Sequence, residues 1–112
     1  MEIDTGDRIL EAELADTMFK RAKGLSLREK GKMLFKFHSD TSASIDMMLL
    51  SEPIYLYFLN SDKTVINVQK AEPWTANPKT WKFYSPDRHY RYLLESFEEL
   101  DVGEGDELKF EV

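Results

Sequence analysis

At 112 residues the chain has the length of a single domain, and we expect one core that spans residues 1–112. Hydrophobic residues make up 42% of the chain and aromatic residues 12%, a content that supports a compact interior and argues against disorder. The formal net charge of −6 argues against general affinity for nucleic acid, and the absence of cysteine excludes disulfides and thiol catalysis.

The sequence has no segment that predicts membrane insertion. Its longest apolar run, Met47 to Leu50, is far too short to cross a bilayer, and its first residues lack the basic and apolar stretches of a signal peptide. Together with the absence of cysteine, this pattern predicts a cytoplasmic location and no membrane partner.

Charge is segregated along the chain. Basic residues gather between Lys20 and Lys36 and again between Lys79 and Arg91, whereas acids crowd into Glu2–Asp16 and Glu95–Glu111. If the two basic segments meet in space, an acidic protein would still present a basic face. Nucleic-acid binding requires that meeting and would weaken steeply with salt, so we rank it below the other functions considered.

The first predicted elements are a strand and a short helix. Residues 10–14 alternate between apolar and acidic side chains, which indicates a half-buried strand. Asp16 or Thr17 can then accept a hydrogen bond as a helix N-cap, and Gly24 suits the left-handed position just past a helix end. We therefore expect one short α-helix near residues 17–24.

The remainder of the chain reads mostly as short strands. Alternating apolar residues predict strands at 33–37, 45–49, 54–58, 65–70, 90–94 and 108–112. Asn60 to Lys63 has the composition of a hairpin turn. One short helix among many short strands predicts a mainly β fold, a compact two-layer β-sandwich or barrel of the jelly-roll kind.

A long segment between Glu72 and His89 interrupts this pattern. Three prolines discourage a central strand there, yet the segment also carries four aromatic residues: Trp74, Trp81, Phe83 and Tyr84. A loop of this length and composition either packs over the core or binds a partner.

The order of several short motifs resembles a known family. The motifs are Ala15-Asp16-Thr17, Arg21, Gly24-Leu25, Arg28, Gly31, Met33-Leu34-Phe35, Pro53, Pro73-Trp74, Tyr92-Leu93-Leu94-Glu95 and Gly105-Asp106. In this order they resemble the small bacterial and archaeal family called domain of unknown function 192. The resemblance implies a two-layer β fold with one short helix, and it implies no established activity, cofactor or substrate.

The sequence departs from that family's pattern in one stretch. Many members carry F-W-M-K-N-T followed by P-L-D-I, where this chain has Ile45 to Leu50 and Pro53 to Leu56. The Trp, Lys, Asn and Asp of the family pattern are therefore missing, and an activity that depends on them is not expected here.

The candidate binding residues are Arg21, Trp74, Trp81 and Arg88. Aromatic faces can stack on sugars or bases, and planar guanidinium groups hold phosphates or carboxylates. The alternative is structural: Arg21 would brace the helix against the sheet, and the aromatic rings would plug the open end of the sandwich.

The case for catalysis depends on His38 and His89. They are far apart in sequence and lack the short, regular spacing of metal ligands, so we expect neither a metal site nor a cofactor. The leading hypothesis is a small non-catalytic binding or accessory domain for an anionic or sugar-like ligand or a protein partner. The alternative is a hydrolytic enzyme that uses His38 or His89 with nearby carboxylates.

Overall fold

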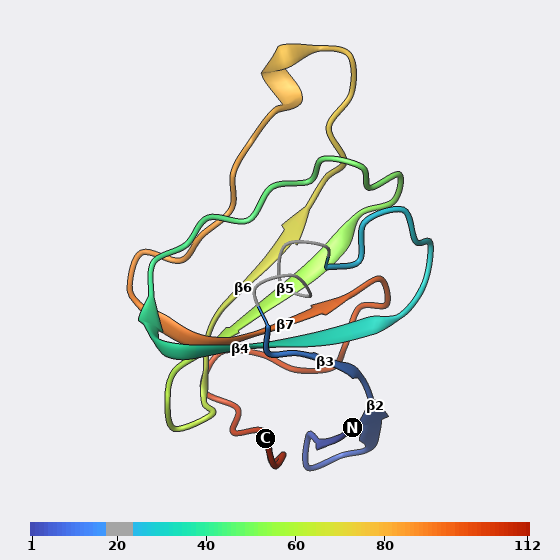
Figure 1. Ribbon diagram of the computed structural model, residues 1–112. Coiled ribbons are helices and arrows are strands. Elements are labelled where there is room, and N and C mark those ends of the chain that lie inside the picture. The colour runs from blue at the N-terminus through green and yellow to red at the C-terminus, as the bar shows by residue number, and fades with distance from the viewer. Residues whose placement is uncertain (18–23) are drawn as a thin grey trace.

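The computed structural model describes residues 1–17 and 24–112, and it confirms a mainly β fold in which two sheets pack into a compact globule (Figure 1). The described elements are β1 (Glu2–Asp4), β2 (Ile9–Glu11), β3 (Glu13–Ala15), β4 (Lys32–Thr41), β5 (Ile54–Leu59), β6 (Val65–Ala71), the 3-10 helix η1 (Pro78–Thr80) and β7 (Tyr90–Ser96). The helix expected near residues 17–24 falls on positions 18–23, outside the described residues.

The larger sheet has the order β3-β4-β7-β5-β6, so the last strand in sequence occupies the centre. Its pairs are antiparallel except for β3, which runs parallel to β4. The smaller sheet joins β1 to β2 and lies beside the end of the chain, where Asp4 bridges to Lys109. The Asn60–Lys63 turn is confirmed, because the Asn60 side chain accepts hydrogen bonds from two backbone N–H groups of the β5–β6 connection.

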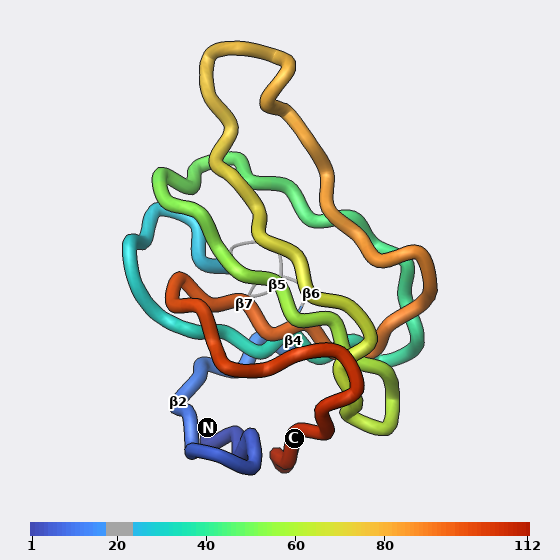
Figure 2. The backbone as a smooth tube through the Cα atoms, turned by 180° about the vertical axis from the view of Figure 1, so that it is seen from behind, coloured from blue at the N-terminus to red at the C-terminus, as the bar shows by residue number. Residues whose placement is uncertain are grey.

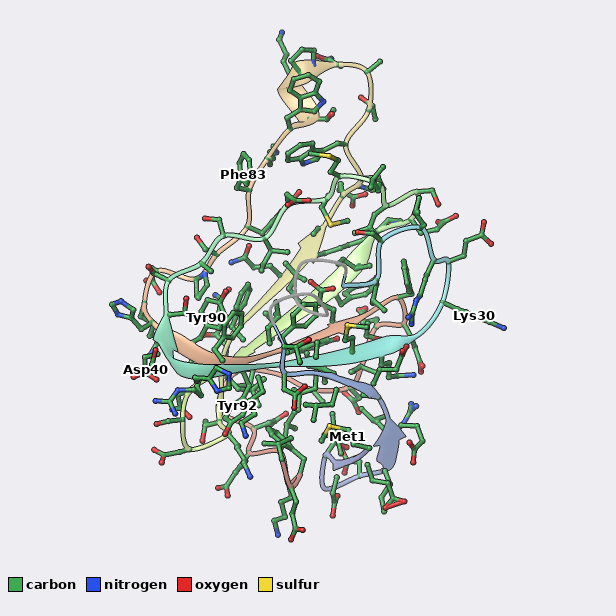
Figure 3. The ribbon with its side chains drawn as sticks, viewed as in Figure 1. Met1, Lys30, Asp40, Phe83, Tyr90 and Tyr92 are labelled. Carbon is green, nitrogen blue, oxygen red and sulfur yellow. The ribbon has the colours of Figure 1, made fainter. Side chains whose placement is uncertain are left out.

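Both faces of the larger sheet are buried. On β7, Leu93 belongs to one apolar cluster and Leu94 to the other, and Figure 3 shows Tyr90 and Tyr92 on opposite sides of the sheet. These two tyrosines would share a face in a regular strand, and the pairing of β4 with β7 is irregular between Lys36 and Thr41. Burial on both faces explains why β5 is apolar throughout and why all residues of β7 except Arg91 are buried.

Two predicted strands do not form. Residues 45–49 and 108–112 contribute only isolated bridges; of the residues expected on their core-facing sides, Met47, Leu108 and Phe110 are buried, whereas Leu49 and Val112 are exposed. In the first segment the Asp46 carboxylate accepts a hydrogen bond from the Met48 N–H, a local turn that competes with strand pairing.

The segment between Glu72 and His89 rises from the sheet as a projection at the end of the molecule opposite both termini (Figures 1 and 2). Its base is tied to the rest of the protein by a two-way backbone pair between Ile45 and Tyr84. At its tip, the Asn77 side chain caps η1 by accepting a hydrogen bond from the Lys79 N–H.

Candidate functional site

Three aromatic side chains of this projection form what we call the aromatic cluster: Trp74, Trp81 and Phe83. The indole of Trp74 stacks on that of Trp81 with ring centroids 6.1 Å apart, and the Phe83 ring meets the Trp74 indole edge-on with centroids 5.3 Å apart. Trp74 packs partly against the apolar core, whereas Trp81 is 51% exposed and Phe83 is 65% exposed. The cluster therefore extends from the apolar core, at Trp74, to the solvent-exposed rings of Trp81 and Phe83.

The projection holds its own tryptophans in place through hydrogen bonds. The indole N–H of Trp74 donates to the Lys82 carbonyl at 2.8 Å, and that of Trp81 donates to the Thr75 carbonyl at 2.8 Å. The Thr75 N–H in turn donates to the Thr80 hydroxyl. Because both indole donors are used within the loop, the cluster offers a partner ring faces and edges rather than hydrogen-bond donors.

Two lysines, Lys79 and Lys82, flank Trp81 in the sequence and are exposed. Neither ammonium group forms an ion pair with another residue in the described part of the chain. The tip therefore combines exposed aromatic surface with two uncompensated positive charges.

Of the remaining candidate residues, Arg88 lies apart from the cluster and Arg21 lies outside the described residues. The segment that carries Arg88 turns back toward the start of β7, away from the tip, as Figures 1 and 2 both show. Its guanidinium lies 3.4 Å from the Ile66 carbonyl and 3.9 Å from the Asp87 carboxylate. The structure thus brings Trp74 and Trp81 together and leaves Arg88 at the base.

Neither histidine has the surroundings of a catalytic base. His38 and His89 are both exposed, and neither imidazole forms a hydrogen bond or ion pair with a described residue. Residues 1–17 and 24–112 also contain no group of three or more histidine and acidic side chains that could hold a metal ion. This geometry gives no support to hydrolysis centred on His38 or His89.

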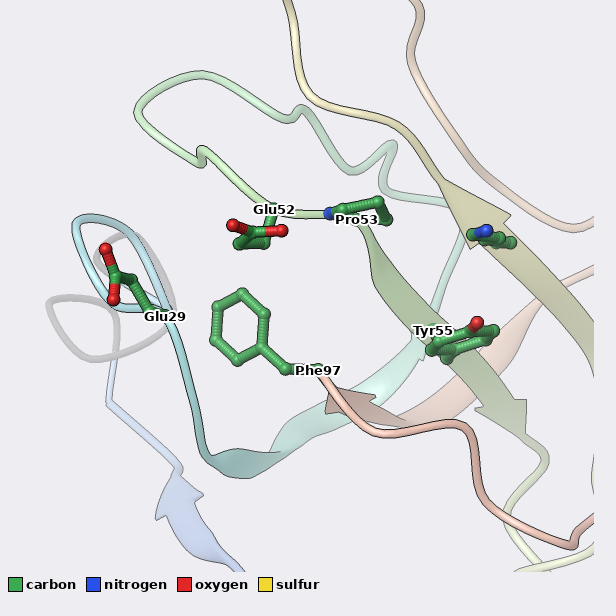
Figure 4. A pocket seen from close by; sticks show the side chains of 6 residues that line it. Glu29, Glu52, Pro53, Tyr55 and Phe97 are labelled. Atoms are coloured by element: carbon green, nitrogen blue, oxygen red, sulfur yellow. The ribbon is translucent and has the colours of Figure 1, made fainter.

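A second feature is a cleft of about 390 Å³ beside the start of β5. Figure 4 shows its lining, which comprises Glu29, Glu52, Pro53, Tyr55, Lys70 and Phe97. Sequence reasoning missed Glu29 and Phe97, because the lining comes from four separate segments and no local motif contains it. Pro53 and Tyr55 belong to the stretch in which the chain departs from the F-W-M-K-N-T…P-L-D-I pattern.

A buried carboxyl group lies on the same face of the sheet as the main core cluster. Glu95 of β7 is only 4% exposed, and its Cα pairs with Met33 on one side and Leu56 on the other. Burial raises the pKa of Glu95 to about 8, and the nearby Asp46 charge adds to the effect. Glu95 is therefore largely neutral at pH 7.

Comparison with known proteins identifies a family whose members are similar to this chain in sequence. The family described as Uncharacterized ACR (DUF192) matches residues 1–110. A UPF0127 protein of Pyrococcus furiosus is 32% identical over 108 residues, an alignment that covers 90% of this chain and 87% of that protein. A UPF0127 protein of Thermococcus sibiricus is also 32% identical over 108 residues, with 89% of this chain and 66% of that protein covered.

A solved structure shares the fold. A protein of unknown function from Novosphingobium aromaticivorans matches with a TM-score of 0.78 at 20% identity, covering 97% of this chain and 82% of that chain. Within the described residues, no helix has the length and apolar character that crossing a membrane requires.

Proposed function

The chain belongs to the DUF192 family, which has no established activity, and we propose that it is a non-catalytic recognition module for a protein partner. The aromatic cluster makes the contact, with Trp81 and Phe83 entering an apolar groove on the partner. The observation that carries this proposal is the exposure of both rings on a projection whose two indole N–H groups are already hydrogen-bonded within it.

The shape of the projection favours a macromolecular partner over a small ligand. Small-molecule sites are concave and surround most of the ligand, whereas the segment that carries the aromatic cluster projects from the sheet (Figures 1 and 3). Exposed tryptophan and phenylalanine rings at such a point are typical of the central contacts of protein interfaces.

The charge at the tip narrows the partner's chemistry. Lys79 and Lys82 add two positive charges beside the rings, so the groove that fits them has carboxylates at its rim. The net charge of −6 on the whole chain disfavours nucleic acid, because the rest of the surface would repel phosphates.

The test compares the proteins retained by the immobilised wild type with those retained by Trp81→Ala/Phe83→Ala. Ile9→Ala is the matched control, because it removes an exposed apolar side chain at the opposite end of the molecule. A protein kept by the wild type and the control is then purified, and its Kd is measured by calorimetry. We expect the double variant to bind it at least about thirtyfold more weakly, as the loss of two central aromatic contacts implies.

Two results would contradict this proposal. One is a set of partners that bind the double variant as tightly as the wild type. The other is binding of the wild type, but not of the double variant, to vesicles of anionic lipid without any protein present, which would make the tip a membrane contact. A separate variant, Lys79→Gln/Lys82→Gln, should slow association and reduce its salt dependence while leaving the dissociation rate nearly unchanged.

A further inference from the structure

The cleft of Figure 4 is assembled from two loops that backbone hydrogen bonds hold in place. The Phe97 N–H donates to the Gly31 carbonyl at 3.3 Å, which keeps the loop that carries Glu29 beside the end of β7. The Leu27 N–H donates to the Leu49 carbonyl at 2.9 Å, which joins the same loop to the segment that leads to Glu52. The backbone that carries both glutamates is therefore held beside Phe97 by the fold.

Among the described residues, the side of the cleft around Phe97 carries negative charge that no ion pair compensates. Glu29 and Glu52 lie around the Phe97 ring, and neither forms an ion pair with any other described residue. Lys30, the neighbour of Glu29, points away from the protein (Figure 3).

Among the described residues that line the cleft there is one cation, and it occupies the wall opposite Phe97. The Lys70 ammonium lies 5.8 Å from the centre of the Tyr55 ring and 3.8 Å from the Glu72 carboxylate. The arrangement shows that an aromatic wall of this cleft already accepts an ammonium group. The half-buried Phe97 ring on the other side has two carboxylates beside it and no cation from the described chain.

We propose that this cleft binds an organic cation, an alkylammonium or guanidinium group on an apolar stem, between Glu29 and Glu52 and against the ring of Phe97. The ring face attracts the cation through its quadrupole, and the two carboxylates add Coulombic attraction and accept its N–H groups. Pro53 and the ring of Tyr55 supply apolar surface for the stem. A volume of about 390 Å³ accommodates one long side chain, and the two carboxylates would repel the phosphate of a nucleotide.

The chemistry of the lining disfavours a metal ion. Calcium and magnesium are surrounded by several oxygen ligands, and an aromatic ring provides none. The proposal is also independent of the aromatic cluster, since no residue of that cluster lines this cleft. Either site can fail its test without affecting the other.

The test is a titration of the 15N-labelled protein, followed by backbone amide NMR at constant ionic strength. N-acetyl-arginine amide represents a cationic side chain of a peptide, and spermidine represents a free polyamine. N-acetyl-citrulline amide is the uncharged counterpart of the arginine ligand. We expect saturable shifts at the amides of Glu29, Tyr55 and Phe97 with a cationic ligand and none with citrulline, and the tighter of the two cations identifies the source.

Variants separate the two contributions to binding. Glu29→Gln/Glu52→Gln should weaken binding about tenfold, whereas Glu104→Gln/Glu107→Gln removes the same charge at exposed positions elsewhere and should leave it within about twofold. Phe97→Leu keeps an apolar side chain without the ring and should weaken binding about two- to fivefold.

Three outcomes would overturn the proposal: no saturable shifts with either cation, equal shifts with citrulline, or unchanged affinity in Glu29→Gln/Glu52→Gln. The glutamate substitutions are on the surface, so this comparison remains decisive even if Phe97→Leu fails to fold.

Discussion

Replacing Glu95 by glutamine tests the most unusual electrostatic feature of the core. The carboxyl group is buried on the central strand, and among the described residues the titratable groups coupled to it are Asp46 and Tyr90. Burial raises the pKa of Tyr90 to about 12, so that hydroxyl stays neutral throughout the range considered. Glutamine has nearly the same shape as the protonated acid and remains neutral at every pH.

The sign of the expected pH dependence follows from the pKa of Glu95. Below pH 4.5 the carboxyl is neutral in both the folded and unfolded states. Between pH 4.5 and about 8 the unfolded chain loses a proton that the folded protein keeps, so the free energy of unfolding falls as pH rises. Above that range the loss is complete. At about 1.4 kcal/mol per pH unit, the total fall in the free energy of unfolding amounts to roughly 5 kcal/mol.

Urea denaturation of the wild type and Glu95→Gln at pH 5, 6, 7, 8 and 9 measures this effect, because groups shared by both proteins cancel in the comparison. We expect nearly equal stability at pH 5 and a growing advantage for Glu95→Gln that reaches several kcal/mol at pH 9. The reasoning is refuted if the two proteins show parallel pH profiles, or if Glu95→Gln is the less stable one at pH 9. The second result would mean that a positive charge holds the ionised carboxylate.

Three further substitutions probe backbone and packing, each by urea denaturation at pH 7. Tyr57→Phe should cost about 1–3 kcal/mol, because the buried hydroxyl accepts a hydrogen bond from the Leu100 N–H at 2.8 Å and its removal leaves that donor unpaired. Gly24→Ala should cost about 1–2 kcal/mol, since φ is +51° and the added methyl would lie 3.2 Å from the Phe35 ring. Leu49→Asn should be neutral or stabilising by up to about 1 kcal/mol, because leucine at φ +66° is strained and its side chain is exposed.

Each of these has a control or an opposing result. Tyr55→Phe removes a hydroxyl that lies at the cleft and should change stability by less than about 0.5 kcal/mol. Gly103→Ala adds a methyl group to open space at a residue without positive φ, so it should be tolerated where Gly24→Ala is not. A clear loss of stability in Leu49→Asn would show that the leucine side chain makes contacts worth more than the backbone strain.

The strands that sequence alternation predicted best are those that pair along their length. Residues 54–58, 65–70 and 90–94 all lie within β5, β6 and β7. The prediction failed at 45–49, where Met47 is buried but Leu49 is exposed, and a carboxylate-to-backbone turn takes the place of strand pairing. Alternation of apolar residues therefore does not establish that a neighbouring strand is present.

The site residues were also predictable only in part. Trp74 and Trp81 could be linked from sequence because they lie close together in one proline-broken loop, and the structure stacks them. Arg88 belongs to the same stretch, but its segment turns back to begin β7, so proximity in sequence was misleading there. Glu29 and Phe97 could not be linked from the sequence, because the register of β7 and the closure of two loops bring them together.

The central place of β7 also has a consequence for how the protein is made. Its neighbours β4 and β5 are synthesised first, yet they do not pair with each other, and both wait for residues near the end of the chain, as the pairing of Lys32 with Ser96 illustrates. During translation the pairs β1–β2, β3–β4 and β5–β6 can form before β7 exists, while the edges of β4 and β5 that pair with β7 and the apolar faces of both strands remain open to water. A ribosome stalled before Tyr90 would therefore hold a nascent chain that chaperones recognise, and release of the last twenty or so residues would complete the sheet in one step.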